Sequence, residues 1–485
     1  MDENRELIEI RSQIRGSNID FVDGGFKISG HEVVLLGAGF SHAVSEAFPL
    51  NDDLGRQAAE RARLAETVLP PGGFHDGNFE TWLSQLAEAP PYCLEDEVFA
   101  RRAILVRTTR ALALELRDRE YVAFSTDAPS WLYDLVGLMH HRRMVVITFN
   151  YDTAVETAVR SHSLWHRNGI ARQVVPDDVL ANMPPLYAGG VPVVGVGPPS
   201  AAEAPAQTFQ LLKLHGSLDW FWSSGDRTGA TLRRVTTLGE FGAPALDDPE
   251  RRDREVPGLV PFIVPPTATK SVYFQNPLTR YLWRTAFEAL RHAERVALVG
   301  YSLPGADLLT LAMLSDALRD RKVTVEVVNP EPAGLLERLR GLGIDSPAVT
   351  SGSNCVGTFV SATRDRIASL AADQVRALPT EANDALVVVH WAVAGLRSKR
   401  ASDAYVQSVE RSDGELRLVH MVGATDTHRA IRVSELRSQL GQGTRISLST
   451  SSGELLPVIG LKLSLGPSPT QIGFLELQTC GRVTA

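Results

Sequence analysis

Five short apolar runs, rich in valine and leucine, alternate with long stretches of helical periodicity, and this alternation constrains the fold more than any other feature of the chain. The runs cover residues 32–37, 143–149, 210–214, 295–300 and 323–328. The helical stretches include residues 54–68, 101–120 and 276–294. Strands separated by helices pair in parallel, because each helix returns the chain to the edge at which the previous strand began. The sequence therefore predicts an α/β, Rossmann-like fold with a doubly wound parallel sheet.

The pattern changes twice along the chain. Residues 160–208 are rich in proline, glycine and alanine, so we expect an irregular insertion here that could cover the site. After residues 376–384, short segments of alternating polar and apolar residues with turn signals replace the helical pattern. We therefore predict two domains, a nucleotide-binding catalytic domain over residues 1–375 and a small all-β domain over residues 385–485. We expect a linker with few contacts between them, and a role for the second domain in regulation or oligomerisation.

Charge and composition exclude several classes of function. The chain of 485 residues carries a formal net charge of −8, whereas a nucleic-acid-binding surface needs clustered lysine and arginine. No uninterrupted apolar stretch is long enough to cross a bilayer. The three cysteines lie far apart and predict neither a zinc site nor a disulfide framework. The acidic run at residues 95–97 is interpreted as the solvated start of a helix. We expect a cytoplasmic protein without a metal and without a membrane or nucleic-acid partner.

Glycine and polar residues follow the five runs, at the points where the strands are expected to end. In chain order these residues are Gly37, Ala38, Gly39, Phe40, Ser41, Asn150, Asp152, His215, Gly300, Tyr301, Ser302 and Asn329. Ligands of doubly wound sheets bind beyond the carboxyl ends of the strands. We therefore predict that these residues form one binding site.

The loop after the first run reads Gly-Ala-Gly-Phe-Ser and leads into a helix. Glycine lets the backbone approach a ligand closely with its N–H groups free, and the start of a helix favours an anion. We expect residues 37–41 to bind the pyrophosphate of a nucleotide. A dinucleotide-binding dehydrogenase carries a further glycine at the sixth position of this fingerprint, where the chain has His42. The loop therefore argues against an ordinary dehydrogenase.

Together, the segments G-A-G-F-S, T-F-N-Y-D, H-G, G-Y-S and V-N at the ends of the runs resemble the sirtuin-like domains, and more closely those of bacterial anti-phage defence systems. The resemblance covers roughly residues 30–375. Sirtuins that deacetylate proteins carry a zinc module of four cysteines, which the three cysteines of this chain cannot build. The resemblance therefore implies a sirtuin fold without the zinc module, and it puts peptide deacetylation in doubt while leaving NAD cleavage in place.

The resemblance also implies roles for individual residues. The loop at residues 37–41 holds the phosphates of NAD, and Asp152 belongs to the segment that binds the cofactor. Asn150 and His215 form the reacting centre. The segment at residues 300–302 and Asn329 hold the adenosine half of the molecule.

The chemistry of NAD cleavage agrees with these residue types. Breaking the nicotinamide–ribose bond generates an oxocarbenium-like ribose, so the enzyme needs a neutral polar group that orients water or the ribose hydroxyls, and a base with a pKa near neutrality. Asn150 and His215 meet that description, and Ser41 and Ser302 add hydroxyl groups. Two simpler interpretations stay open from the residues alone: Asn150 as a turn residue and His215 as a hydrogen-bonded core histidine.

We therefore expect an NAD glycohydrolase that takes NAD as its substrate and releases nicotinamide and ADP-ribose without a metal. The resemblance implies an NAD-depleting effector of anti-phage defence by abortive infection, a homo-oligomer, and control by a partner defence protein or a phage-derived activator. Two alternatives remain. One is a module that senses NAD or an ADP-ribose derivative without turnover. The other is an ADP-ribosyltransferase or deacylase, which needs an acceptor groove.

Overall fold

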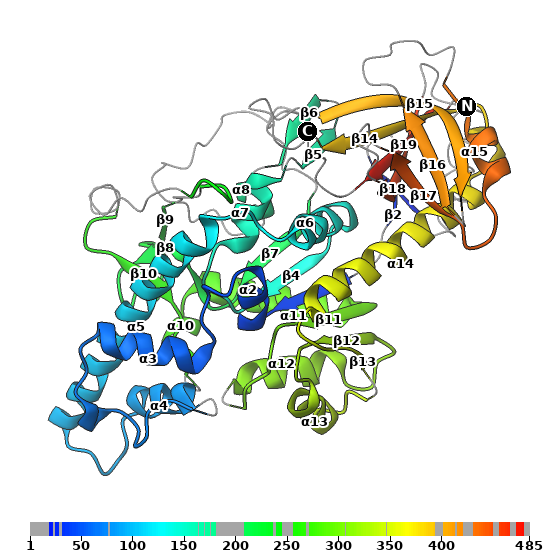
Figure 1. The fold of residues 1–485 in the computed structure, drawn as a ribbon. Helices are drawn as coiled ribbons and strands as arrows, with labels where there is room; N and C mark the ends of the chain where they lie inside the picture. The colour runs from blue at the N-terminus through cyan, green and yellow to red at the C-terminus, as the bar shows by residue number, and fades with distance from the viewer. Residues whose placement is uncertain are drawn as a thin grey trace, which may run out of the picture.

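A six-stranded parallel sheet runs through the middle of the molecule in the computed structural model (Figure 1), with the strand order β13-β12-β11-β3-β4-β7. Its strands are β3 (Glu32–Leu36), β4 (Val145–Thr148), β7 (Gln210–Lys213), β11 (Arg295–Val299), β12 (Thr324–Val328) and β13 (Ala348–Thr350). Five of them coincide with the apolar runs, so the predicted doubly wound parallel sheet is confirmed. The sixth, β13, has three residues at the sheet edge, too few and too exposed to leave an apolar pattern in the sequence.

The structure describes residues 19–22, 25–28, 32–75, 78–162, 164–168, 170–174, 176–180, 208–235, 239–244, 256–267, 271–305, 307–345, 347–392, 401–412, 415–420, 430–449, 455–465 and 472–479. The first part of the predicted insertion forms a hairpin of β5 (Trp165–Asn168) and β6 (Ile170–Gln173), followed by α8 (Pro176–Val179). Residues 181–207 lie outside the described ranges, and so does most of the predicted cover over the site.

Helices pack on both faces of the parallel sheet. Val34 and Leu36 of β3 belong to a core with helices on one face, whereas Val33 and Leu35 belong to the core on the opposite face. Residues that alternate along a strand point to opposite faces, which explains why β3 is apolar throughout. The first face carries α2 (Ala38–Val44), α6 (Ser130–Arg142), α7 (Ala154–Ser161) and α14 (Cys355–Ala377). The second carries α11 (Pro277–His292), α12 (Leu308–Leu318) and α13 (Ala333–Gly341).

A group of three helices extends from one end of the sheet (Figure 1). It consists of α3 (Asn51–Arg61), α4 (Asn78–Ala87) and α5 (Glu95–Phe124), which share a core that includes Phe79, Trp82 and Leu112. The predicted helix at residues 54–68 ends at Arg61, because Arg63 takes a left-handed backbone conformation, and the short helix η1 (Glu66–Val68) follows. The predicted helix at residues 101–120 is part of α5, which begins in the acidic run at residues 95–97, as interpreted from the sequence, and continues to Phe124.

A smaller antiparallel sheet packs against the core on the second face of the parallel sheet. It contains β8 (Gly216–Trp222), β9 (Arg233–Arg234) and β10 (Val260–Ile263), and α10 (Ser271–Phe274) follows it. Trp220 and Trp222 of β8 are buried in this core. No helix among the described residues combines the length and the apolar character needed to cross a membrane.

The C-terminal part of the chain forms a closed barrel of six strands, and the predicted small all-β domain is thereby confirmed. The strands are β14 (Leu386–Ala392), β15 (Ala401–Ser412), β16 (Glu415–His420), β17 (Arg445–Ser449), β18 (Leu455–Leu465) and β19 (Ile472–Thr479). The helix α15 (Val433–Gln439) also contributes to its core, together with the short helix η2 (Thr380–Ala382).

Helix α14 belongs to both parts of the molecule (Figure 1). Its first half supplies Phe359 to the core of the parallel sheet, and its second half supplies Ala371 and Val375 to the core of the barrel. At the other end of the chain, the hairpin of β1 (Ile19–Val22) and β2 (Gly25–Ile28) lies against β18. The expected linker with few contacts is therefore absent from the described chain between α14 and β14, because the last turns of α14 are part of the barrel core.

Candidate active site

The candidate site lies at the carboxyl edge of the parallel sheet, where the direction of winding reverses. β4 and β7 follow on one side of β3, whereas β11 and β12 lie on its other side. The helix that follows β3, α2, lies on the first face of the sheet, whereas the helix that follows β11, α12, lies on the second, and such switch points are where doubly wound sheets bind ligands. Gly37 directly follows β3, and Gly300 directly follows β11.

Three glycines at the switch point lie against each other's loops. The N–H of Gly39 donates to the carbonyl oxygen of Gly300 at 2.8 Å, and a Cβ added at Gly39 would lie 2.9 Å from that oxygen. At Gly37, an added Cβ would lie 2.6 Å from the Cα of Tyr301. Gly300 has a φ of +61°, and a Cβ there would lie 2.1 Å from the backbone nitrogen of Phe40. The contact between the two loops thus requires glycine at all three positions.

This contact also uses N–H groups that were expected to face a pyrophosphate. The N–H of Gly37 donates to the last carbonyl oxygen of β11 at 3.1 Å, and the N–H of Phe40 donates to the carbonyl oxygen of Gly37 at 2.9 Å. With the bond from Gly39, three N–H groups of the predicted phosphate loop are hydrogen-bonded within the protein. The reason is that the loop packs on the end of β11 and at once begins α2. Ala38, between these positions, is exposed.

Phe40 is predicted to bind the cofactor, and the structure instead places its side chain in the core. Its ring meets the ring of Trp131 edge to face, with 5.8 Å between the ring centroids. The cause is the turn of α2, which directs this position toward the layer of helices that includes α6.

The side-chain amide of Asn150, just after β4, is held from two sides. Its Nδ2 donates to the carbonyl oxygen of Gly37 at 2.8 Å and to Oγ of Ser41 at 2.8 Å. A backbone carbonyl oxygen can only accept a hydrogen bond, so the amide nitrogen has to face Gly37 and the orientation of the amide is settled. Because both N–H bonds of the amide are used in this way, the group that Asn150 offers to a ligand is the acceptor Oδ1.

Ser41 connects Asn150 to Asp152. Its hydroxyl donates to Oδ2 of Asp152 at 2.6 Å and accepts the bond from Asn150. The other carboxylate oxygen of Asp152 accepts from the N–H of Ala154 at 3.1 Å, at the start of α7. Ser41 and Asp152 are predicted to bind the cofactor, and in the structure their side chains fix the position of Asn150.

A buried ion pair that the sequence analysis does not predict adjoins these residues. Nζ of Lys213 donates to Oε1 of Glu156 at 2.9 Å and to the backbone carbonyl oxygen of Asp152 at 2.5 Å. Both charged side chains are 1% exposed. Burial acts to lower the pKa of Lys213, but the carboxylates of Glu156 and Asp219 outweigh it and hold that pKa above its ordinary value. The signal in the sequence is a lysine inside an apolar strand run.

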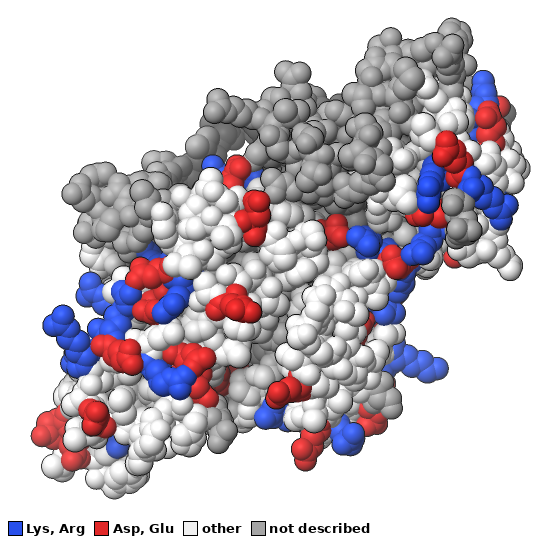
Figure 2. Space-filling model, viewed as in Figure 1, with Lys and Arg blue, Asp and Glu red and all other residues white. Residues whose placement is uncertain are grey.

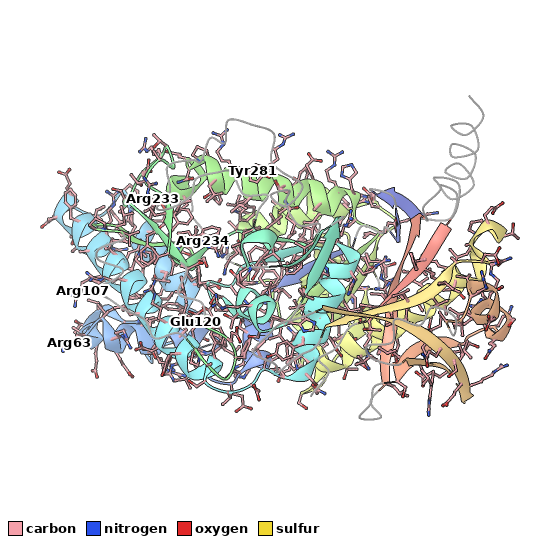
Figure 3. The ribbon with its side chains drawn as sticks, turned by 90° about the horizontal axis from the view of Figure 1, so that it is seen from above. Arg63, Arg107, Glu120, Arg233, Arg234 and Tyr281 are labelled. Carbon is pink, nitrogen blue, oxygen red and sulfur yellow. The ribbon has the colours of Figure 1, made fainter. Side chains whose placement is uncertain are left out.

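Glu120 of α5 borders the same segment, and it lies nearer the sheet than Arg107 of the same helix (Figure 3). Its Oε1 accepts from the N–H of Thr153 at 2.5 Å and from the hydroxyl of Thr153 at 2.8 Å. Burial and the charge of Asp152 raise the pKa of Glu120 to about 8, against the two bonds from Thr153, which lower it. Glu120 is therefore mainly protonated at neutral pH. Nothing in the sequence around it distinguishes it from other acidic residues of a long helix.

His215 follows β7 at the position that matches Asn150 on the neighbouring strand. Thr148 of β4 pairs with Lys213 of β7, and each of the two candidate catalytic residues comes two positions after this pair. Parallel strands in register therefore bring Asn150 and His215 to the same edge of the sheet.

Aromatic rings surround the imidazole of His215, and the residue is 6% exposed. The centroid of the imidazole lies 5.1 Å from the ring centroid of Phe149, 6.5 Å from that of Tyr151 and 6.3 Å from that of Trp283. Phe149 in turn stacks on Tyr301, with 4.6 Å between the centroids. These contacts hold the plane of the imidazole at the strand end.

Tyr301, Ser302 and Asn329 lie at the ends of β11 and β12, where the adenosine half is expected. The hydroxyl of Tyr301 donates to Oδ2 of Asp307 at 2.9 Å, and Tyr301 is buried. Ser302 is exposed, and its carbonyl oxygen accepts from the guanidinium of Arg338 at 2.8 Å. Oδ1 of Asn329 accepts from the N–H two residues later at 2.9 Å, which fixes the turn after β12. Tyr301 and Asn329 thus have structural partners, whereas the side chain of Ser302 faces solvent.

Within the described ranges, no group of three or more histidine, cysteine, aspartate or glutamate side chains is arranged to hold a metal ion. Cys93 and Cys355 are free thiols, and Cys480 lies outside the described residues.

No family model matches this chain, and no curated protein matches it. Among solved structures, the chain is similar to one described as the structural basis for the mechanism and regulation of Sir2 enzymes. The two share 14% sequence identity with a TM-score of 0.30, over 76% of this chain and 99% of the other. It is also similar to a point mutant of a Sir2 homologue in complex with ADP-ribose, at 15% identity and a TM-score of 0.32, over 69% of this chain and 92% of the other. At these values the likeness assigns no activity, and the function has to be argued from the site of this chain.

Proposed function

We propose that this chain hydrolyses NAD at the bond between nicotinamide and ribose. The observation that carries the proposal is the fixed amide of Asn150, which presents Oδ1 at the carboxyl edge of the sheet, one strand away from His215. A turn residue needs no such network, because its amide would only have to serve its own backbone. The three bonds from Asn150 and Ser41 favour a group that is held ready for a ligand.

The proposed reaction converts NAD and water into nicotinamide, ADP-ribose and a proton. The bond between C1′ of the ribose and the nicotinamide nitrogen breaks, and its electron pair leaves with nicotinamide. The oxygen of water then bonds to C1′, and the proton of that water passes to a base. Oδ1 of Asn150 accepts a hydrogen bond from the water or from a ribose hydroxyl, and His215 accepts the proton.

We further propose that this activity depletes NAD in the cytoplasm as the effector of an anti-phage defence system. The support is the resemblance of the strand-end segments to sirtuin-like defence domains. A homo-oligomer and an activating partner, either a defence protein or a phage-derived molecule, belong to the same proposal.

The test is incubation of the purified full-length chain with NAD, followed by measurement of nicotinamide and ADP-ribose. Asn150→Ala and His215→Ala should each lower the turnover by about a hundredfold or more, as expected for loss of an orienting group or a general base. His292→Ala, at the exposed end of α11, is the matched control and should keep the rate of the unmodified chain. Thermal melting establishes that all three variants are folded.

Turnover by Asn150→Ala or His215→Ala at the unmodified rate would show that the proposed mechanism is wrong. NAD binding in calorimetry without nicotinamide release, both alone and with extract of phage-infected cells, would support the sensing module instead. Nicotinamide release that depends on an acylated peptide or a protein acceptor would support deacylation or ADP-ribosyl transfer.

A further inference from the structure

Helix α5 carries apolar residues on two opposite faces. Its inner face, which includes Ala111 and Leu112, packs against α3 and α4. On the outer face, the side chain of Phe99 is 61% exposed and that of Val106 is 64% exposed. Large apolar side chains on an exposed helix face mark a surface for another molecule when they form a continuous stripe.

The outer residues do form one stripe. Glu95, Phe99, Ala103, Val106 and Arg110 follow one another at intervals of four, four, three and four residues, and all five are exposed. Residues at these intervals lie above one another along a single helix face. We call these five residues the outer stripe of α5. Along the chain it reads acidic, apolar, small, apolar, basic.

The outer stripe is complementary to an antiparallel copy of itself, because the acidic end then meets the basic end and the apolar residues meet each other. If a second α5 lies antiparallel, with a two-fold axis beside Ala103, Phe99 of each copy meets Val106 of the other. In the same arrangement Glu95 of each copy meets Arg110 of the other. The small side chain of Ala103 lies at the crossing point, where the helices approach most closely. In a two-fold interface every contact occurs twice, which is the pattern that the outer stripe provides.

We propose that the outer stripe of α5 binds a second copy of this chain, so that two antiparallel α5 helices form a dimer. Charge decides the orientation, because a parallel pair in register would place Glu95 against Glu95 and Arg110 against Arg110. Tyr92 and Leu94, which precede the helix and are also exposed, extend the apolar surface.

The outer stripe of α5 is accessible to a second copy of the chain. α5 lies in the helical group at the end of the molecule away from the barrel, so a second copy can approach it (Figure 1). On the face of the molecule in Figure 2, acidic and basic side chains are interspersed and neither sign is gathered into a large patch. One helix pair makes a small interface, which gives a dimer that dissociates on dilution.

The experiment is sedimentation velocity of the full-length chain over a range of concentrations. The unmodified chain should shift with concentration from the 52.8 kDa monomer toward a species of twice that mass. Glu95→Arg and Arg110→Glu should each weaken the dimer about tenfold or more, because each places like charges together. The double variant Glu95→Arg/Arg110→Glu restores opposite charges and should restore the dimer.

A matched pair of valines on the same helix provides the control. Val106 belongs to the outer stripe, whereas Val122 lies on a different side of α5 and is 57% exposed. Val106→Asp should abolish the dimer, and Val122→Asp should leave it unchanged. A chain that is monomeric at every concentration overturns the proposal. So does a dimer or larger assembly that persists in Val106→Asp and in both charge-reversal variants, because the contact then lies elsewhere, for example on the barrel.

Discussion

At the scale of single residues, the orientation of Asn150 follows from one hydrogen bond to a group that can only accept. The carbonyl oxygen of Gly37 fixes the amide nitrogen, and Ser41 takes the second N–H. Asp152 in turn orients the hydroxyl of Ser41. The amide is therefore set before a ligand arrives, and binding need not order it.

Glu120 is the residue whose protonation should be visible in the stability of the protein. The pKa of Glu120 is about 8 in the folded chain, whereas the pKa of an ordinary glutamate in the unfolded chain is about 4.5. The folded chain therefore holds this proton where the unfolded chain has lost it, and the contribution of Glu120 to stability falls as pH rises from about 4.5 to about 8.

Glu120→Gln should remove this loss, because glutamine resembles the protonated acid and can still accept from Thr153. We expect the variant to come close to the unmodified chain at pH 5 and to exceed it at pH 8.5, by on the order of 4 kcal/mol in the free energy of unfolding. Urea unfolding at the two pH values measures the difference. An equal gap between the two proteins at both pH values would mean that Glu120 titrates normally in the folded chain.

At the scale of elements, the start of α2 and the end of β11 form one unit through their glycines. Gly39 lies in a loop whose sequence is typical of phosphate binding. In the structure, however, the absence of a side chain at Gly39 lets the backbone of Gly300 pack against it. Loss of NAD binding after substitution of Gly39 would therefore not identify a phosphate contact, since the added Cβ meets protein first.

Gly300→Ala tests this unit. An alanine there would take a left-handed conformation and meet the backbone nitrogen of Phe40, so we expect a loss of about 2 kcal/mol or more in the free energy of unfolding. Gly334→Ala, in α13 with open space around it, is the control and should gain up to about 1 kcal/mol from helix propensity. Urea unfolding compares the two. If Gly300→Ala is as stable as the unmodified chain, the two loops are not in the close contact described.

At the scale of the whole molecule, α14 joins the parallel sheet to the barrel. Arg437 of α15 donates to the backbone carbonyl oxygens of Leu378 and Pro379 at the end of this helix. On the other side, Arg366 of α14 pairs with Glu32 of β3 at 2.8 Å, and Arg142 of α6 pairs with the same carboxylate at 3.0 Å. Through these contacts α14 connects the barrel to β3.

The fragment 1–378 should therefore be less soluble than the full chain and melt at a lower temperature. Without the barrel, Val375 and Leu378 lose their cover, and burial of each such side chain is worth about 1.5–3 kcal/mol. Melting curves and light scattering of the fragment measure the effect. The same fragment with Val375→Gln and Leu378→Gln should aggregate less. If the plain fragment is as soluble and as stable as the full chain, α14 does not share its core with the barrel.

The sequence determined those parts of the fold and of the candidate site that depend on local pattern. A buried parallel strand is apolar throughout, so the five apolar runs predicted five of the six strands. The carboxyl ends of parallel strands lie at one edge of the sheet, so the sequence also predicted that Asn150 and His215 lie at the same edge. The tertiary structure alone decided what surrounds them. Lys213, Glu156 and Glu120 come from three different elements, and a charge becomes a buried partner only when packing brings those elements together. A glycine-rich loop has the same sequence pattern whether its glycines face a phosphate or another backbone. Only the tertiary structure showed that Gly39 faces Gly300.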